Sequence, residues 1–363
     1  MKVLIPFEIP EINSSKQNPF IPELVFSLKF NGCDIDTGVS FLDSDIKDWD
    51  IVNFQWPEYI LPFCGVKNDP IGWLRNRLLL IKKKSKIVIT IHNLLPHRDK
   101  SDFSRSVYSL LYELADGFIH FSEKSIDIIQ QKFHAQVINK KHTVIPHGNY
   151  SIYGPKVSKA EAKKFFGLQD KPSFLFMGAI RHKEEYKLIK LASKCVKNAG
   201  ADSLQAYRIS IFDRKLFKES ISNKVKFLIS KFWINKSKKN IIYASGIPFN
   251  MMSKLLSATD VLFIPRINSL NSGLVQLGFT YGCVVLGSEF GNIGDQLKQT
   301  NNPTFNYSNL SEDYFQGVIN KAVNLINSNL GSNNLNFAHC NLDWNIIGKK
   351  YKLFYEELIK NDA

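Results

Sequence analysis

Short apolar runs alternate with longer amphipathic runs along most of the chain, and the two kinds of run differ in period. Runs rich in β-branched and aromatic residues, such as Lys86–His92 and Ser173–Met177, predict buried strands. Tyr186–Asn198 and Trp344–Lys360 carry apolar residues three and four positions apart, which predicts amphipathic helices. Strands that alternate with helices in this way predict a parallel sheet covered by helices on both faces.

The alternation restarts after a polar stretch at residues 154–171, so the sequence predicts two successive halves. A chain of 363 residues also suggests about two domains. We therefore expect an α/β fold of two doubly wound, Rossmann-like domains at residues 1–160 and 161–340, followed by a terminal helix at 341–363. In such sheets ligands bind beyond the carboxyl ends of the strands, and a cleft between two domains is the obvious site.

Composition narrows the class of protein. Hydrophobic residues make up 44% of the chain and charged residues 22%, which are globular proportions and not those of a disordered chain. No apolar run approaches the ~18–20 residues of a membrane span, and Met1–Pro6 is typical of a first buried strand, not of a signal peptide. The five scattered cysteines favour reduced thiols in a cytoplasmic protein over a disulfide framework or a zinc site.

The formal net charge of +14 calls for an anionic partner, unless it serves solubility alone. Residues 73–84 and 224–239 each combine lysines or arginines with aromatic and apolar residues. Each stretch either lies on an anionic membrane surface or packs on its own sheet with the lysines outside. No recognition motif for nucleic acid accompanies the charge, so we expect no nucleic-acid partner.

Two segments of the second half carry candidate phosphate chemistry. The strand at Ser173–Met177 runs into Gly178, where the backbone can turn tightly, and then into Arg181 and Lys183 at the start of a helix. The strand at Val261–Pro265 runs through Arg266 into a helix that opens at Asn271, Ser272 and Gly273. Each helix start is either simply capped or binds an anion. Two such starts after strands in one half predict a single diphosphate between them.

These segments resemble the nucleotide-sugar domain of GT-B glycosyltransferases, particularly family 4 and related polysaccharide-building enzymes. Phe176–Lys183 is similar to the family's "FG-x-IR-x-x-K", and Pro265–Gly273 to "P-x-R-x-x-x-x-SG". The first half adds four shorter similarities, in the family's order, to "NPY", "HWPE", "T-x-H-N-x-x-P-H" and "IPHG": Asn18–Phe20, Trp56–Glu58, Thr90–His97 and Val144–Gly148.

The resemblance implies roles for these residues. Residues 1–160 would bind the acceptor, residues 161–340 the nucleotide sugar, and the helix at 341–363 would pack back on the first domain. The donor diphosphate would be held by Gly178, Arg181, Lys183, Asn271, Ser272 and Gly273. Arg266 would lie beside the donor or support its loop. His92 would face the sugar and the acceptor, and neither a metal nor another cofactor would be required.

The sequence departs from the family at the positions of two glutamates, which here are Leu270 and Gly278 when counted from Gly273. Gln55 also stands where the family has a histidine, and Lys187 competes with Lys183. An inverting reaction needs a general base, and the candidates in the first half are Glu58, His92, His97, Asp99 and His120. We expect His92 first and Glu58 second. The alternatives are a core histidine and a surface carboxylate.

The resemblance therefore implies a hexosyltransferase. It would move a sugar from a UDP- or GDP-sugar to a hydroxyl of a lipid-linked oligosaccharide during synthesis of a bacterial surface polysaccharide, as a peripheral protein at the inner face of the cell membrane. Two alternatives keep the fold and change the activity. One is a non-catalytic scaffold or partner of an active transferase, and the other is a nucleotide-sugar epimerase.

Overall fold

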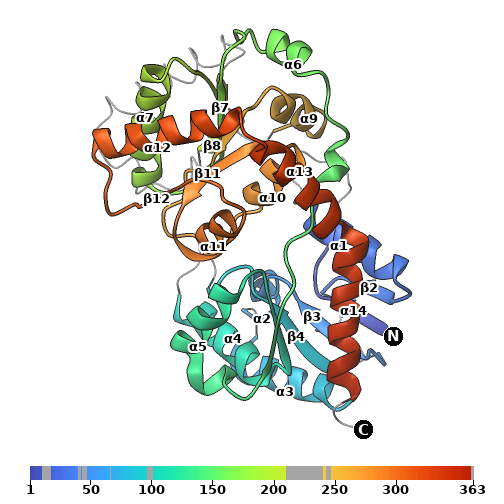
Figure 1. The fold of residues 1–363 in the computed structure, drawn as a ribbon. Coiled ribbons are helices and arrows are strands. Elements are labelled where there is room, and N and C mark those ends of the chain that lie inside the picture. The colour runs from blue at the N-terminus through green and yellow to red at the C-terminus, as the bar shows by residue number, and fades with distance from the viewer. Residues whose placement is uncertain are drawn as a thin grey trace. The chain divides into compact units, whose positions relative to one another are not determined.

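The computed structural model describes residues 1–9, 18–39, 42, 47–65, 67–95, 101–209, 240–242 and 247–360, and these divide into two compact units (Figure 1). Of the described residues, those up to Gly148 and those from Leu342 onward form the first unit, and those from Asn149 to Asn341 form the second. The change of unit thus comes at Gly148 and not at residue 160. Tyr150, Ala162 and Phe166 are the reason, because they are buried in the core of the second unit.

The described part of the first unit holds a parallel sheet of six strands in the order β2-β1-β3-β4-β5-β6. The order reverses between β1 and β3, which is a topological switch point. Its elements are β1 Lys2–Ile5, α1 Phe20–Phe30, β2 Asp34–Thr37, β3 Ile51–Phe54, the 3-10 turn η2 Pro57–Tyr59, α2 Leu61–Cys64, α3 Pro70–Lys82, β4 Lys86–Thr90, α4 Asp102–Leu114, β5 Gly117–His120, α5 Glu123–Val137, β6 Lys141–Val144 and α14 Trp344–Lys360.

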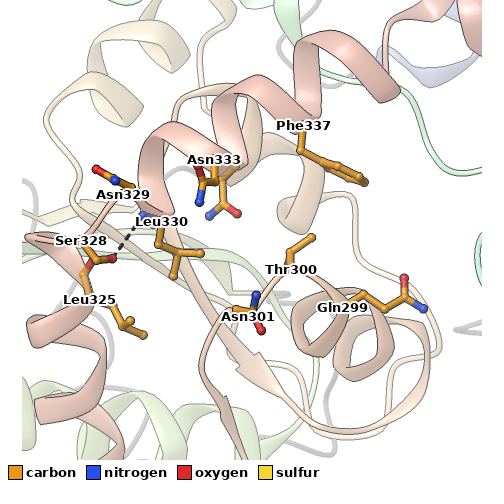
Figure 2. A pocket seen from close by; sticks show the side chains of 10 residues that line it. Gln299, Thr300, Asn301, Leu325, Ser328, Asn329, Leu330, Asn333 and Phe337 are labelled. Carbon is orange, nitrogen blue, oxygen red and sulfur yellow. Dashed lines mark hydrogen bonds between the residues drawn. The ribbon is translucent and has the colours of Figure 1, made fainter.

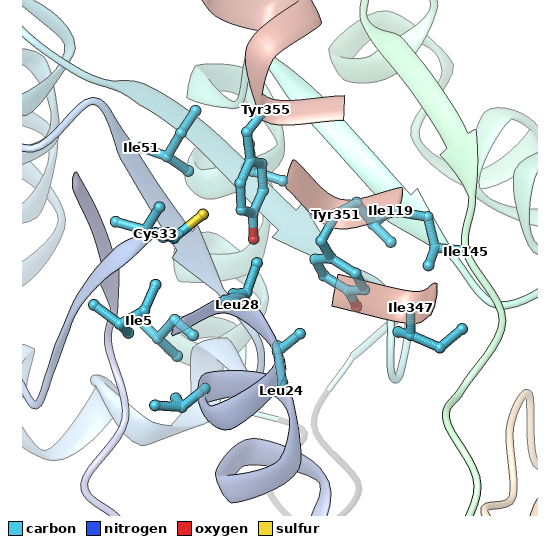
Figure 3. Close-up of a cluster of buried hydrophobic side chains, with 14 of the residues drawn as sticks. Ile5, Leu24, Leu28, Cys33, Ile51, Ile119, Ile145, Ile347, Tyr351 and Tyr355 are labelled. Carbon is cyan, nitrogen blue, oxygen red and sulfur yellow. The ribbon is translucent and has the colours of Figure 1, made fainter. Parts of the chain in front are cut away.

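The last helix, α14, completes the core of the first unit. Its apolar residues recur at helical spacing, and Ile347, Tyr351 and Tyr355 are fully buried against α1 and the sheet (Figure 3). Gly348 allows α14 to approach α1 closely, because a Cβ there would overlap the Ser27 side chain. The buried amide of Asn53 donates to the Tyr355 hydroxyl over 2.5 Å, so the polar end of that ring is satisfied as well.

The described part of the second unit also holds a parallel sheet of six strands, in the order β12-β11-β10-β7-β8-β9. This is the dinucleotide-binding strand order, and it reverses between β7 and β10. Its elements are η3 Ser151–Tyr153, α6 Lys159–Phe165, β7 Ser173–Ile180, α7 Lys183–Asn198, β8 Asp202–Ile209, β9 Asn240–Ile242, α9 Phe249–Ser257, β10 Val261–Phe263, α10 Leu274–Thr280, β11 Val284–Ser288, α11 Gly291–Gln299, β12 Thr304–Phe305, α12 Glu312–Ile326 and α13 Leu330–Asn341.

Six helices and strands of the two units escaped the sequence pattern: β2, α2, α6, β12, α11 and α13. The helices α2 and α6 have only four and seven residues, and α6 lies in the polar stretch at residues 154–171. The two strands are edge strands of four and two residues, too short to show a period. The sequence of α11 contains two glycines, and that of α13 four asparagines, both of which are poor helix formers. No helix in the described ranges is both long and apolar enough to cross a membrane.

Candidate functional site

The loops that follow β7 and β10 flank the switch point of the second unit, which is where a doubly wound sheet binds its ligand. Gly178, near the end of β7, has a φ of +125°, a conformation that side-chain-bearing residues rarely adopt. A Cβ on Gly178 would lie 3.2 Å from Nη2 of Arg266 and 3.3 Å from Cδ1 of Leu274, the first residue of α10. The structure therefore brings together the two segments that the sequence assigned to one diphosphate.

Arg266 is held inside this edge of the sheet by two contacts. Its Nη1 donates to the carbonyl oxygen of Ala179 over 2.5 Å and forms an ion pair of 3.0 Å with the carboxylate of Glu185. The side chains of Arg266 and Glu185 are only 7% and 3% exposed. Of the two roles expected for Arg266, these contacts correspond to support of the loop after β7.

Glu185, a residue of the first turn of α7, also caps the start of that helix. Its Oε2 accepts from the backbone N–H of Arg181 over 2.6 Å and from that of His182, while the His182 side chain caps the Glu185 backbone N–H. A negative group thus already occupies the helix start that we expected to hold a phosphate. An additional anion at this place depends on the side chains of Arg181, which is half-buried, and Lys183, which is exposed.

The start of α10 is arranged by side chains as well. Asn271 accepts through Oδ1 from the amide of Asn292 over 2.5 Å, and Ser272 Oγ accepts from the N–H of Leu274 over 3.4 Å. The helix is only seven residues long, and its sequence, LVQLGFT, contains no carboxylate. Gly278 has no room for one, because a Cβ there would lie 2.5 Å from Cγ2 of Val285. Leu270 is buried and apolar.

At the carboxyl edge of the first unit's sheet, the short motifs of the first half converge on a cluster of aromatic and histidine rings, which we term the aromatic-histidine cluster. The ring of Phe20 lies 4.8 Å from the rings of both His92 and His147, measured between centroids. Trp56 stacks on His92 at 3.8 Å. Trp344 of α14 lies 5.4 Å from Phe20. Residues far apart in the sequence therefore form one largely buried cluster beside the switch point between β1 and β3.

His92 lies inside this cluster and is 8% exposed. Its Nε2 is 3.0 Å from Oε1 of Gln55, so the imidazole donates there when Nε2 carries the proton. Burial, with a smaller effect from His147, holds the pKa of His92 well below its usual range. The imidazole is therefore neutral at neutral pH. The amide nitrogen of Gln55 is buried with no partner among the described residues.

Of the remaining candidates for a general base, the structure describes Glu58 and His120. Glu58 is half-buried and accepts from the hydroxyl of Tyr108 on α4. Burial and the charge of Glu58 raise the pKa of Tyr108, so that phenol stays protonated. His120 is enclosed by Ser125 and His142 at 2.7 and 2.9 Å, and burial lowers its pKa to about 3. His97 and Asp99 lie outside the described residues.

The first basic stretch, residues 73–84, lies on α3 and the turn after it. Leu74, Leu78 and Ile81 pack on the sheet. Three of its bases bind carboxylates elsewhere in the unit, in the pairs Arg75–Glu113, Lys82–Asp116 and Lys84–Asp48. Leu79 and Leu80 nevertheless point outward, 43% and 44% exposed. The second stretch, residues 224–239, lies outside the described residues. No group of His, Cys, Asp and Glu in the described ranges is arranged to hold a metal ion.

The structure is similar over almost its whole length to solved glycosyltransferases. Sucrose-phosphate synthase from Thermosynechococcus elongatus has a TM-score of 0.69 and 12% identity, with 99% of each chain covered. The catalytic domain of starch synthase IV from Arabidopsis thaliana, solved with ADP and acarbose, has a TM-score of 0.67 and 11% identity, also with 99% of each covered. HepE from Anabaena, solved with UDP-glucose, has a TM-score of 0.62 and 12% identity, with 98% of this chain and 100% of HepE covered.

No family model matches the chain, and no curated protein matches it in sequence. At such low identity the structural likeness establishes the fold, which is the GT-B fold of these enzymes. The predicted α/β architecture of two doubly wound, Rossmann-like domains is thereby confirmed.

Three residues of these sites were missed in the sequence: Glu185, Gln55 as the partner of His92, and Tyr108. Glu185 stands three residues after His182, which is the spacing of a capping box. Because the first residue of that box is a histidine and not a serine or threonine, the motif was not visible. Tyr108 lies 50 positions from Glu58, and no local pattern connects them.

Proposed function

We propose that the chain is a glycosyltransferase that moves a hexose from a nucleotide-sugar donor to an acceptor hydroxyl. The observation that supports this most is the approach of Gly178 to Arg266 and Leu274 at the switch point of a sheet with dinucleotide-binding order. The donor diphosphate lies over Gly178 and against the start of α10 at Asn271, Ser272 and Gly273. This is the edge of the sheet at which such folds bind their ligands.

Arg181 and Lys183 supply the positive charge for the diphosphate in this proposal, and no metal is required. Arg266 does not contact the donor; it holds the loop after β7 in place through Ala179 and Glu185. Glu185 in turn fixes the backbone at Arg181, so the Arg181 side chain starts from a rigid position. A preorganised charge loses little entropy when the anion binds.

The two candidates for the general base differ in their access to an acceptor. His92 is neutral at neutral pH, which a base requires, but it is buried under Trp56. Glu58 is half-buried at the carboxyl edge of β3 and held by Tyr108. We therefore propose Glu58 as the group that takes the acceptor proton if the reaction inverts, with His92 as a residue that shapes the acceptor site.

We further propose that the acceptor is a lipid-linked glycan of a bacterial surface polysaccharide, at the inner face of the membrane. The exposed Leu79 and Leu80 on α3, with Arg77 and Lys83 beside them in sequence, suit an anionic lipid surface. Sedimentation with phosphatidylglycerol vesicles measures this. Equal binding of the wild type and of Leu79→Gln/Leu80→Gln would remove α3 from the proposal.

The donor site is tested by calorimetric titration of UDP, GDP and CMP. We expect one nucleotide to bind the wild type saturably and Arg181→Ala to lose at least about tenfold in affinity, as for a charge-assisted contact. Lys197→Ala is the matched control, because Lys197 is an exposed base in the last turn of the same helix, roughly 20 Å further along α7. Equal losses in both variants would refute the assigned site.

A non-catalytic relative is the second candidate, and one observation favours it. The α10 helix carries no carboxylate, and Gly278 has no space for a side chain. The same titration separates the two candidates. If the folded wild type binds no nucleotide at millimolar concentration, the transferase proposal fails and the scaffold remains.

A further inference from the structure

A pocket of about 470 Å³ opens in the second unit, away from the loops after β7 and β10. It is lined by the end of α11, the turn between α12 and α13, and the first turns of α13 (Figure 2). Because α11 and α12 each run back from the carboxyl edge of the parallel sheet, their C-terminal ends lie at the opposite edge. The pocket is therefore separate from the candidate donor site, which lies at the carboxyl edge.

The polar groups of this pocket are neutral. None of the described residues that line it is charged, although 22% of the chain is. Four exposed lining amides make no side-chain hydrogen bond within the described ranges; they are Gln299, Asn301, Asn329 and Asn333. Each amide offers two donors and an acceptor, so together they can bind a group that both donates and accepts.

One aromatic ring adds an apolar face to these amides. Phe337 is 37% exposed, and Figure 2 shows it on α13 facing the end of α11. Its ring is held edge-on by Phe279, with 6.1 Å between the ring centroids. Leu330, buried at the start of α13, lies between the two sides of the pocket. An exposed ring fixed in this way is a platform for the C–H face of a ligand.

The walls of the pocket are fixed by a pair of buried amides beneath it. Asn302 and Asn334 bind each other over 2.9 and 3.0 Å. Asn302 also accepts from the N–H of Val285 over 2.9 Å, and Asn334 donates to the carbonyl oxygen of Cys283 over 2.8 Å. These bonds connect the end of α11 and the start of α13 to strand β11. The exposed amides therefore stand on a rigid frame and need little ordering when a ligand binds.

We propose that this pocket is a binding site for a neutral saccharide. Sugar hydroxyls donate and accept as the four amides do, and a sugar ring presents a C–H face to Phe337. A phosphate or a nucleotide would find no positive charge among the lining residues. A purely apolar ligand would cover the amides and leave them unpaired. The volume falls within the ~300–1,000 Å³ of small-molecule pockets.

A saccharide in this pocket lies at the opposite edge of the sheet from the reacting centre, so it is held there and not transformed. The site suits a stretch of glycan remote from the end that reacts, and binding there raises the local concentration of that end. That role rests on the proposed transfer, whereas the binding of a saccharide does not, because an intact chain that binds no nucleotide still has this pocket.

The test is the binding of the labelled full-length protein to an array of neutral and charged oligosaccharides, in the wild type and in three variants. We expect the wild type to bind at least one neutral glycan. Phe337→Ala and Asn333→Ala should weaken that binding, the first by about tenfold. Asn336→Ala is the matched control, since Asn336 is an exposed amide on the same helix, α13, that does not line the pocket. Its affinity should equal that of the wild type.

Circular dichroism melting curves show whether each variant is folded, and Asn333→Ala keeps the test valid if Phe337→Ala is unstable. The proposal is overturned if the folded wild type binds no neutral glycan, or binds only charged ones. It is also overturned if neutral binding survives both pocket variants unchanged, because the glycan then lies elsewhere on the chain.

Discussion

The Glu185 carboxylate joins two parts of the candidate donor site, and its removal should be costly. Glu185→Ala takes away the ionic partner of Arg266, whose guanidinium stays buried against the carbonyl oxygen of Ala179. It also frees the backbone N–H groups of Arg181 and His182 at the start of α7. Both losses are local, since the rest of the α7 face packs through other residues.

The size of the effect follows from burial. Removal of one partner of a buried ion pair costs about 3–5 kcal/mol, because the other charge is left without compensation. Loss of a helix cap adds about 1 kcal/mol. In a unit of almost two hundred residues, each kcal/mol lowers Tm by about 2–4 °C. We therefore expect the unfolding of the second unit to shift down by roughly 10 °C or more.

Thermal unfolding followed by circular dichroism measures this shift, with Glu312→Ala as the matched control. Glu312 pairs with Lys194 at 2.6 Å in the same unit, but both side chains are about half exposed. Such surface pairs contribute about 0–1 kcal/mol, so Tm should fall by about 4 °C at most. Both variants change the net charge equally.

Equal shifts in Glu185→Ala and Glu312→Ala would refute the argument, because burial would then not distinguish the pairs. A second variant gives an independent check. Glu185→Leu/Arg266→Met removes both charges from the interior and should recover much of the stability lost in Glu185→Ala.

Two further predictions concern stability elsewhere in the chain. Burial holds the pKa of His92 well below its usual range, that of His147 at about 4 and that of His120 at about 3, so each is neutral when folded. The unfolded chain binds these protons near pH 6.5, so stability is full above that pH. Below pH 6.5, the free energy of unfolding falls by up to roughly 1.4 kcal/mol per pH unit for each histidine. Urea unfolding midpoints at pH 7 and pH 5 measure this loss. Equal midpoints at the two pH values would contradict the prediction. Gly278→Ala should cost about 1–3 kcal/mol by overpacking against Val285, whereas Gly317→Ala, with open space around it, should be neutral or stabilise by about 0.4–1 kcal/mol. Similar urea midpoints for the two glycine variants would show that α10 can move away from the sheet.

The fold was largely predictable because its strands and helices have clear periods. The strand at Ser173–Met177 and the helix at Trp344–Lys360 are present, and each lies where its apolar residues require. Short edge strands such as β12 carry too few residues to reveal a period. The sequence predicted the boundary between the units at residue 160 and not at Gly148, because residues 154–171 look like a linker. Ala162 and Phe166 are nevertheless buried in the second unit.

The candidate sites were predictable only in part. Local motifs identified Gly178 and Arg266, since each directly follows an apolar run in the sequence, although the structure places Gly178 inside β7. The pairing of Arg266 with Glu185 spans 81 positions, and that of Glu58 with Tyr108 spans 50, so both depend on the packing of the sheet and its helices. The sequence also favoured His92 as the general base. It could not reveal that His92 is buried under Trp56, because that burial arises only when the unit folds.

The place of α14 in the first unit has a consequence for synthesis on the ribosome. The sheet and α1 of that unit are covered by Tyr351 and Tyr355 of α14, yet about 190 residues of the second unit are translated before α14. Translation proceeds at about 5–20 residues per second, so the apolar face of the first sheet stays uncovered for roughly 10–40 s. The described residues of the second unit all lie between Asn149 and Asn341, so that unit can fold during that interval. The first half of the chain is therefore the part that needs protection from aggregation while it is being made.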